Sequence, residues 1–254
     1  MFIYLSIMFF IIGTIFGSFY NVVGYRVPKG ESLLYPSSHC TKCNHKLTPL
    51  ELIPIFSFLF LGGKCHKCKE KISWFYPIFE FLSGLAFMFS FIIFGLSIDC
   101  LLSIVFVSML LIIIVSDYQT MIIPDEVLIV FSVLILVIKY SIGGFSLVGI
   151  SILNGIGSFL FMLLLKLFGD FIFKKESMGG GDIKLLGVYG VVLGFPISIV
   201  SVFLAAIIGL PISLVFLKVK KSHEIPFGPF LAVSAIVLWF LKLDYNGLIS
   251  ILVK

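Results

Sequence analysis

Charged residues are scarce in this chain. They make up 12% of its 254 residues, whereas hydrophobic residues make up 60%. A soluble domain of this length carries roughly a quarter charged residues. The scarcity excludes an ordinary soluble fold, because so much apolar surface must face lipid or other helices. The net charge of +5 is gathered in a few polar segments and indicates membrane topology rather than a nucleic-acid partner. We therefore expect the lipid bilayer as a partner and no nucleic acid.

Long apolar segments dominate the sequence instead. A membrane-spanning helix needs about 20 mainly apolar residues. We predict an all-α polytopic membrane protein with about eight such helices. Seven remain if the break at Gly194-Phe195-Pro196 only kinks a single helix. The predicted spans are residues 2–22, 76–96, 101–116, 125–140, 147–168, 183–194, 197–217 and 227–243.

Basic residues are nearly absent from one side of this predicted membrane bundle. Fifteen of the 18 Lys and Arg residues lie in or beside odd-numbered connections; the other three are Lys139, Lys242 and Lys254. The positive-inside rule then places the odd-numbered connections in the cytoplasm and both termini outside. The first segment has no basic residues before it and no small-x-small cleavage pattern after it, so we expect a retained helix rather than a signal peptide.

Cysteine is also rare, but four of the five cysteines form two Cys-x-x-Cys pairs. They lie in residues 24–75, a segment with too few apolar residues for its own core, and such segments usually need a metal or disulfides to fold. Four thiolates favour zinc, or less often iron. Two disulfides or free thiols are the alternative, which suits a reducing cytosol less well. We predict a structural Zn²⁺ site formed by Cys40, Cys43, Cys65 and Cys68.

Two aspartates stand where the membrane edge is expected. Asp117 follows the third predicted span, and Asp182 follows the glycines Gly179, Gly180 and Gly181. Both fall in odd-numbered connections, hence on the cytoplasmic side. Charged residues retained near spans usually face the bundle interior and serve a function. Two facing carboxylates share a proton and can hold a water between them, which is the chemistry of peptide hydrolysis without a covalent intermediate.

Simpler roles compete with catalysis at these positions. Asp125 after Pro124 looks like a helix N-cap, and Asp182 could be another. Asp117 ends a helix, where its charge opposes the macrodipole and capping supplies no reason for it. From residue types and spacing alone, a proton-coupled transporter that uses Asp117 and Asp182 as a relay remains an equal alternative. A zinc-stabilised scaffold without chemistry is a third. We expect the glycine run to let backbone approach closely and to adopt positive φ, as a substrate strand pressing against Asp182 would require.

At these motifs the sequence resembles the type IV prepilin peptidases, membrane aspartic proteases of the Gly-x-Gly-Asp type that also act as N-methyltransferases in pilus, secretion and competence systems. Several of the motifs are specific, their order is that of the family, and the likeness runs nearly end to end. The segments that carry it are residues 17–21, 25–28, both Cys pairs, 51–54, 72–77, Glu80, 117–125, 179–184 and 226–230.

The resemblance implies a role for each motif. Asp117 and Asp182 would be the protease centre, with Gly179, Gly180, Gly181, Pro124, Asp125 and Lys184 around it. The substrates would be prepilin and pseudopilin precursors, cut at the cytoplasmic face of the bacterial inner membrane. S-adenosylmethionine would then methylate the new amino terminus. The methyl-transfer site would lie in the Cys-containing segment, with Glu51 and Glu80 as weak candidates that could equally be helix ends or ion-pair partners.

Three segments follow from this interpretation. Residues 1–23 form the first transmembrane helix, residues 24–75 a cytoplasmic zinc-binding subdomain associated with methyl transfer, and residues 76–254 the membrane aspartyl peptidase domain. Lys184 could tune Asp182 or extend toward lipid headgroups, and we favour the headgroups. We expect residues 226–229 to start a helix.

Overall fold

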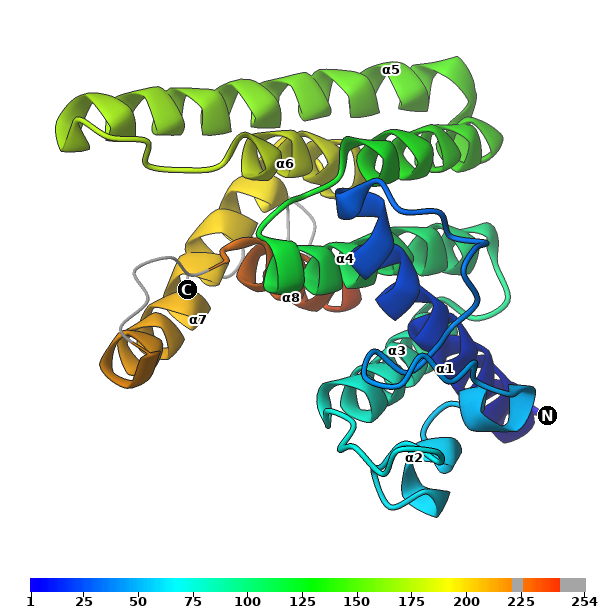
Figure 1. The fold of residues 1–254 in the computed structure, drawn as a ribbon. Coiled ribbons are helices and arrows are strands. Elements are labelled where there is room, and N and C mark those ends of the chain that lie inside the picture. The colour runs from blue at the N-terminus through cyan, green and yellow to red at the C-terminus, as the bar shows by residue number, and fades with distance from the viewer. Residues whose placement is uncertain (221–225, 243–254) are drawn as a thin grey trace. The chain divides into compact units, whose positions relative to one another are not determined.

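A computed structural model describes residues 1–220 and 226–242, which form helices joined by loops (Figure 1). The expected all-α class is confirmed for this part of the chain. Lys221, Lys254 and the last residue of the eighth expected span lie outside the described residues. The chain divides into two compact units, Met1–Cys100 and Leu101–Lys254.

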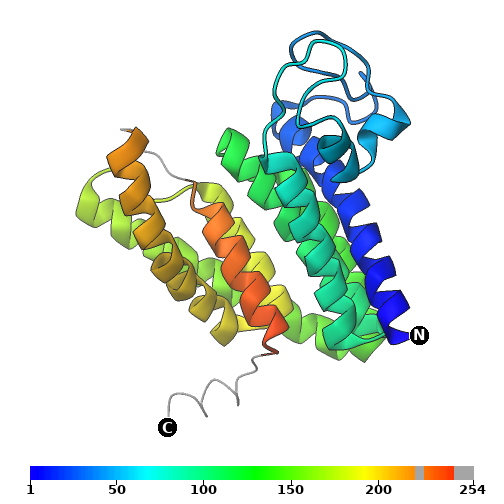
Figure 2. The same cartoon turned by 90° about the horizontal axis from the view of Figure 1, so that it is seen from below.

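Two long helices form the body of the first unit. Helices α1 (Phe2–Arg26) and α3 (Phe75–Phe94) lie side by side (Figure 2). Gly17 permits this close approach, because a Cβ atom at that position would lie 2.7 Å from the side chain of Ser83. Small residues at a helix seam are the usual means of bringing membrane helices together.

The helical segments in the chain between these two helices are all short. They are η1 (Val27–Lys29), η2 (Pro49–Leu52) and α2 (Phe56–Phe60). The first compact unit thus includes the expected first span, the whole cysteine-containing segment and α3. The functional division after residue 75 stays a prediction.

Helix α4 (Ile98–Thr120) supplies much of the core of the second unit. Helices α6 (Gly180–Leu193) and α8 (Gly228–Phe240) reach it through aromatic contacts. The fully buried ring of Phe106 on α4 stands edge-on to one ring from each of these helices, Tyr189 and Trp239. The packing places the C-terminal end of α4 beside the N-terminal ends of α6 and α8, because Asp117 near that end of α4 accepts a hydrogen bond from Gly228.

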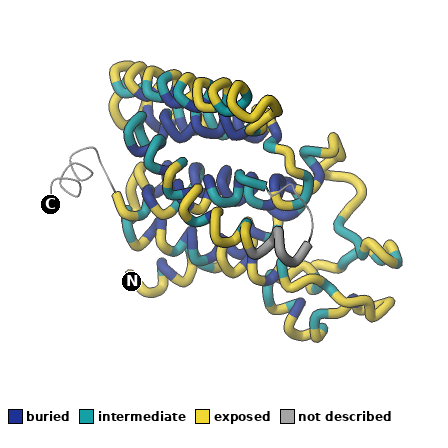
Figure 3. The backbone as a smooth tube through the Cα atoms, turned by 90° about the vertical axis from the view of Figure 1, so that its left-hand side faces the viewer, coloured by how far each residue is buried: buried dark blue, intermediate teal, exposed yellow. Residues whose placement is uncertain are grey.

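Helix α5 (Asp125–Phe173) consists of two helices in succession. Gly143 and Gly144 are non-helical, and Gly144 has a φ of +63°, a conformation that glycine adopts readily. The chain reverses direction there (Figure 1), so that the two halves of α5 run antiparallel. They correspond to the expected spans 125–140 and 147–168. Exposed residues follow the outer side of the second half (Figure 3).

Helix α7 (Phe195–Lys220) completes the second unit. Gly194, with a φ of +84°, ends α6, so α6 and α7 are separate helices. Serine hydroxyls join neighbouring helices: Ser158 on α5 lies 2.7 Å from Ser198 on α7. A second such bond joins α8 to α7, from Ser234 to the carbonyl of Ser201 at 2.8 Å. In an apolar medium such bonds help to hold a bundle together.

Five of the described helices are long and apolar enough to cross a membrane. They are Phe2–Lys29, Phe75–Phe94, Ile98–Thr120, Asp125–Phe173 and Phe195–Leu214. Helix α6 has 14 residues and α8 has 13. The described chain is therefore a helical protein with about five candidate spans. The count of eight, which needs both halves of α5 together with α6 and α8, stays a prediction.

Candidate active site and metal centre

The four paired cysteines are carried by two loops that are built alike. In each loop, the N–H of the first cysteine donates to the carbonyl five residues later. The bond from Cys40 to His45 measures 2.9 Å, and that from Cys65 to Glu70 measures 2.8 Å. Each tight turn directs both of its thiols to one side, as the Cys-x-x-Cys spacing predicts.

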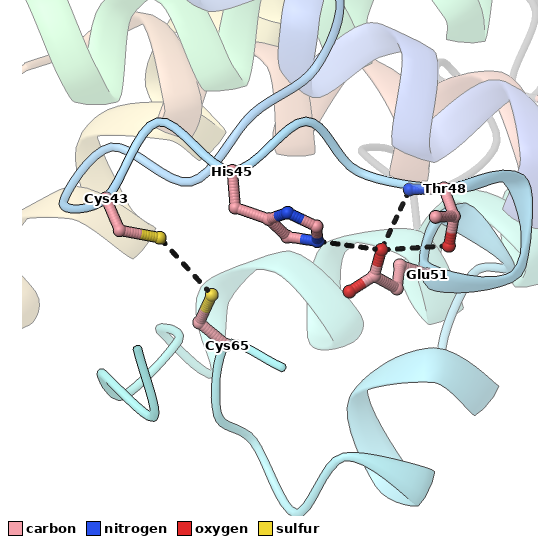
Figure 4. A network of polar contacts seen from close by, with 5 residues as sticks. All are labelled: Cys43, His45, Thr48, Glu51 and Cys65. Carbon is pink, nitrogen blue, oxygen red and sulfur yellow. Dashed lines mark hydrogen bonds and ion pairs between the residues drawn. The ribbon is translucent and has the colours of Figure 1, made fainter. Parts of the chain in front are cut away.

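The four sulfur atoms lie within 4.8 Å of one another. Cys40 and Cys68 are 3.8 Å apart at sulfur, and Cys43 and Cys65, which face each other in Figure 4, are 3.9 Å apart. Sulfurs around a tetrahedral zinc ion with Zn–S bonds of about 2.3 Å would be roughly 3.8 Å apart. The cluster could therefore hold a metal ion. These cysteines are free thiols rather than disulfides.

Backbone dipoles prepare one of these thiols for a metal. The N–H groups of Cys43 and Lys42 point at the sulfur of Cys40 and lower its pKa to about 6. A hydrogen bond to the charged form favours that form. The thiolate, which is the metal-binding species, is thus favoured at neutral pH.

Glu51 closes a polar network beside the cysteines (Figure 4). Its Oε2 accepts hydrogen bonds from the backbone N–H and the hydroxyl of Thr48, both at 2.8 Å, and lies 3.4 Å from Nε2 of His45. Thr48 and Glu51 form a capping box at the start of η2. The Thr48 N–H holds the pKa of Glu51 below its usual range. This environment favours the structural alternative for Glu51, with His45 as its partner.

Glu80 is buried on α3 and faces the turn before α2. Its carboxylate accepts the backbone N–H of Ile55 at 2.8 Å. Ile55 has a φ of +63°, which is uncommon for a β-branched residue. In the part of the chain that the structure describes, no salt bridge to Glu80 is recorded. Glu80 therefore fixes the backbone of the turn.

The two predicted catalytic aspartates lie in the second unit, at helix ends. Asp117 is buried in the last turns of α4, and Asp182 is buried in the first turn of α6. Gly179 is the N-cap of α6. The alternative interpretation of Asp182 as a helix N-cap is therefore wrong. Asp117 and Asp182 are close enough for the charge of one carboxylate to act on the other.

Asp117 has a backbone partner that the sequence did not reveal. The N–H of Gly228, at the start of α8, donates to Oδ2 of Asp117 at 2.8 Å. A Cβ atom on Gly228 would lie 2.6 Å from the same oxygen. The expected helix start is confirmed, with Phe227 as the N-cap and Pro229 in the first turn. The start of α8 thus orients one carboxylate of the pair.

The prediction of a helix cap at Asp125 was wrong. Pro124 is the N-cap of α5, and Asp125 is its first helical residue. Asp125 instead accepts hydrogen bonds from Nζ of Lys184 at 2.7 and 2.8 Å. Lys184 follows Asp182 by two residues, so this ion pair joins the segments that carry the two catalytic candidates. Both side chains are about half exposed, and such pairs contribute about 0–1 kcal/mol.

The glycine run before Asp182 departs from expectation in its backbone. None of Gly179, Gly180 and Gly181 has a positive φ, so that prediction was wrong. Gly181 does allow a close approach, here by another part of the chain, because a Cβ atom there would lie 2.9 Å from Cβ of Ile123. The segment after α4 and the start of α6 are thereby brought together.

Sequence models of two families match the chain on either side of this division. The Bacterial Peptidase A24 N-terminal domain matches residues 11–94, and the Type IV leader peptidase family matches residues 104–214. A protein named prepilin leader peptidase/N-methyltransferase from Bacillus subtilis is 35% identical over 98% of both chains. Proteins of the same name from Neisseria gonorrhoeae and Pseudomonas putida are 30% and 27% identical, each over 90% of this chain and 88% of the relative. No solved structure matches.

The chain belongs to the type IV leader peptidase family. The resemblance inferred from the motifs is thereby confirmed. With its apolar helices, this member of the leader peptidase family is a multi-pass membrane protein. Of the residues that the motifs identified, Asp117, Asp182 and the residues expected around them lie in the second unit, whereas the four paired cysteines, Glu51 and Glu80 lie in the first. Motif analysis included Gly228 in residues 226–230 and expected a helix start there, but it did not identify Gly228 as the partner of Asp117. The sequence signal that could have identified it is a glycine followed by proline at a helix start. The N–H of such a glycine has no partner within the helix, and no side chain obstructs it.

Proposed function

We propose that this protein is a membrane aspartic endopeptidase that removes the leader peptide of type IV prepilins and related precursors, and then N-methylates the new amino terminus with S-adenosylmethionine. The observation that carries the proposal is the pair of buried aspartates, Asp117 and Asp182, brought within electrostatic range at the ends of α4 and α6. The names of the relatives support both activities.

The reaction follows from two carboxyl groups that share a proton. One aspartate, ionised, accepts a proton from a water molecule as the water attacks the scissile carbonyl. The other, protonated, donates its proton to the developing oxyanion. As the tetrahedral intermediate collapses, the first aspartate passes its proton to the leaving nitrogen, the C–N bond breaks, and the second aspartate recovers a proton from the hydroxyl that becomes the new carboxyl group. Because water is the nucleophile, no covalent intermediate with the enzyme forms. The N–H of Gly228 holds Asp117 in a fixed orientation throughout. The ion pair of Lys184 with Asp125 keeps the starts of α5 and α6 together.

The active site would open at the cytoplasmic face of the bacterial inner membrane. The distribution of Lys and Arg supports this orientation, with both termini outside. A precursor with a basic leader and a hydrophobic segment would present its cleavage site at that face.

Zinc would have a structural role in the first unit. The sulfur spacing of Cys40, Cys43, Cys65 and Cys68 fits a tetrahedral thiolate site, and four protein ligands leave no open position for a substrate. When bound, the ion supplies a cross-link between the two loops. We place methyl transfer in this unit, with Glu80 and Glu51 as positioning groups for the backbone and the loop rather than as ligands of the methyl donor.

The test is cleavage of a purified pilin precursor by the full-length protein in detergent. Asp117→Asn and Asp182→Asn should each reduce the cleavage rate by at least about 10²-fold, the scale of general acid–base catalysis. Asp99→Asn makes the same chemical change at the opposite end of α4 and should leave cleavage intact. If both variants cleave the precursor at the wild-type rate, the aspartyl mechanism is excluded and Asp117 and Asp182 have a non-catalytic role.

A further inference from the structure

An apolar segment lies inside the part of the chain expected to be cytoplasmic. Residues 52–60 read Leu-Ile-Pro-Ile-Phe-Ser-Phe-Leu-Phe, with one polar side chain. Several of these side chains are exposed, among them Phe56 at 60%, Leu59 at 57% and Phe60 at 86%. A contiguous exposed apolar surface usually marks an interaction site. Because the segment belongs to a membrane protein, the first question is how deep it lies.

The depth of this segment can be measured against α1. Residues 52–56 and α1 line a common groove, to which α1 contributes Phe10, Thr14 and Ser18. With a rise of 1.5 Å per residue, Ser18 lies about 12 Å and Phe10 about 24 Å along the helix axis from Arg26 at its basic end. Residues 52–56, the first part of the segment, therefore lie beside the middle of a candidate span rather than beyond its end.

Glu80 gives a second, independent measure of depth. Its carboxylate accepts the N–H of Ile55 at 2.8 Å. Its Cα lies 3.1 Å from where a Cβ of Gly17 would be. Glu80, Gly17 and Ile55 thus share one level of the α1–α3 pair, inside both helices.

The backbone of the segment is prepared for an apolar medium. In lipid, each unpaired N–H costs several kcal/mol. The N–H groups of residues 52, 53, 56 and 57 donate to nearby carbonyls, and that of Ile55 donates to Glu80. Pro54 has no N–H. The turn from residue 52 to 57 therefore presents apolar side chains without exposing backbone donors.

The groove also has the properties of a lipid site. Its volume is about 390 Å³ and its lining is mainly apolar, within the usual size range of small-molecule pockets. It is continuous with the exposed apolar face of α1, to which Ile11 and Ile15 belong. Exposed lysines of the same unit provide a positive charge that suits anionic headgroups: Lys42, Lys46, Lys64, Lys67, Lys69 and Lys71.

We propose that residues 52–60 enter the bilayer from its basic side, and that the groove between this segment and α1 binds one acyl chain of an anionic phospholipid. The lipid would fill a surface that the chain leaves open, and would hold the cysteine-bearing loops against the membrane. Neither point depends on the proposed catalytic activity.

Tryptophan fluorescence in vesicles tests the depth. The chain has two tryptophans, so Trp74→Phe and Trp239→Phe provide a background free of tryptophan. In that background, Phe56→Trp and Phe60→Trp should be quenched by phospholipids brominated on their acyl chains, as should Phe16→Trp on the exposed face of α1. Lys67→Trp, on an exposed cysteine loop, should be quenched by iodide instead. Iodide quenching of the variants at 56 and 60, without quenching by brominated lipid, would overturn the insertion.

A titration in detergent tests the groove itself. Brominated phosphatidylglycerol added to the solubilised full-length protein should quench the Phe56→Trp variant saturably, at about one lipid per chain, because residue 56 lines the groove. The Phe60→Trp variant reports the same segment outside the groove and should not saturate. Brominated phosphatidylcholine should bind more weakly. Equal quenching of both variants without saturation would mean that the lipid contacts the segment non-specifically, and it would refute the lipid site. Variants are compared only if their gel-filtration profile and unfolding temperature match those of the background.

Discussion

A single backbone N–H, that of Gly228, donates to Asp117, one of the two carboxylates proposed to be catalytic. The bond from Gly228 to Asp117 needs a residue without a side chain, since an added Cβ atom would lie 2.6 Å from Oδ2. No rotation of a larger residue removes this conflict, because Cβ is fixed by the backbone. The start of α8 and the end of α4 must therefore meet at a glycine.

We expect Gly228→Ala to reduce prepilin cleavage by about 10²-fold, the cost of displacing a catalytic group by roughly 1 Å. Substrate affinity should change less than the maximal rate, because the displaced group is the reacting carboxylate. Gly149→Ala is the matched control, since a Cβ atom there has no neighbour within 4 Å. A normal cleavage rate in the Gly228→Ala variant would show that the Gly228 N–H does not position Asp117.

At the level of residues, the charged side chains of the candidate site could be predicted from the sequence, but the backbone groups that contact them could not. Asp117 and Asp182 could be singled out because a charge near a span needs a reason. The N–H of Gly228 could not, because every non-proline residue carries one and only packing selects which N–H meets a carboxylate. Asp125 misled for a related reason. Its position after proline is typical of a cap, whereas its partner Lys184 lies 59 residues away.

At the level of elements, α6 carries Asp182, one of the two proposed catalytic residues, at one end, and a buried lysine of α5 contacts its other end. Nζ of Lys139 on α5 donates to the carbonyl of Val191 at 2.6 Å and to that of Val192 at 3.4 Å. It also donates to Ser151 at 3.0 Å. A cation at a helix C-terminus satisfies carbonyls that have no partner within the helix. The three bonds hold the end of α6 against both halves of α5.

Replacing this cation should destabilise the second unit. We expect Lys139→Met to lower the free energy of unfolding by about 1–2 kcal/mol, because hydrogen bonds inside membrane bundles contribute on that scale. Lys166→Met, on the same helix, should change it by less than about 0.5 kcal/mol. Equilibrium unfolding in mixed micelles of a mild detergent and sodium dodecyl sulfate provides the measurement. Equal stability of the two variants would assign Lys139 no anchoring role.

The order of helices was more predictable than their role in packing. Apolar run length and interruptions by glycine and proline located both halves of α5 and separated α6 from α7, because such runs are the main requirement of a membrane helix. The same runs do not tell which short helix crosses the bilayer. Helix α6 has only 14 residues. The helices that pack against it are determined by contacts between residues far apart in the sequence, which the apolar runs do not reveal.

Considered as a whole, the chain consists of two units that are stabilised by different means. The second is packed from long helices, and its buried residues come from α4 to α8. The loops of the first unit have few buried side chains, so we expect a metal held by the cysteine cluster to take the place of a core there. The spacing of the cysteines predicted this cluster, but the sequence could not predict the placement of residues 52–60. That placement depends on Glu80, which pairs with the backbone of Ile55 rather than with a charge.

Removing the metal should therefore affect the two units unequally. Binding of a structural zinc contributes roughly 10–16 kcal/mol at neutral pH, far more than a loop segment of this size can supply by itself. A strong chelator, or Cys40→Ser combined with Cys43→Ser, should remove zinc and make residues 30–73 sensitive to protease, while the fragment from α4 onward stays resistant. Methyl transfer should then be lost, while cleavage by Asp117 and Asp182 persists.

Cys100→Ser is the control. Because Cys100 lies outside the cluster, this variant should keep its full zinc content. Mass spectrometry of the fragments and metal analysis provide the readouts; unchanged protease resistance after complete zinc loss would mean that the metal does not hold this segment together.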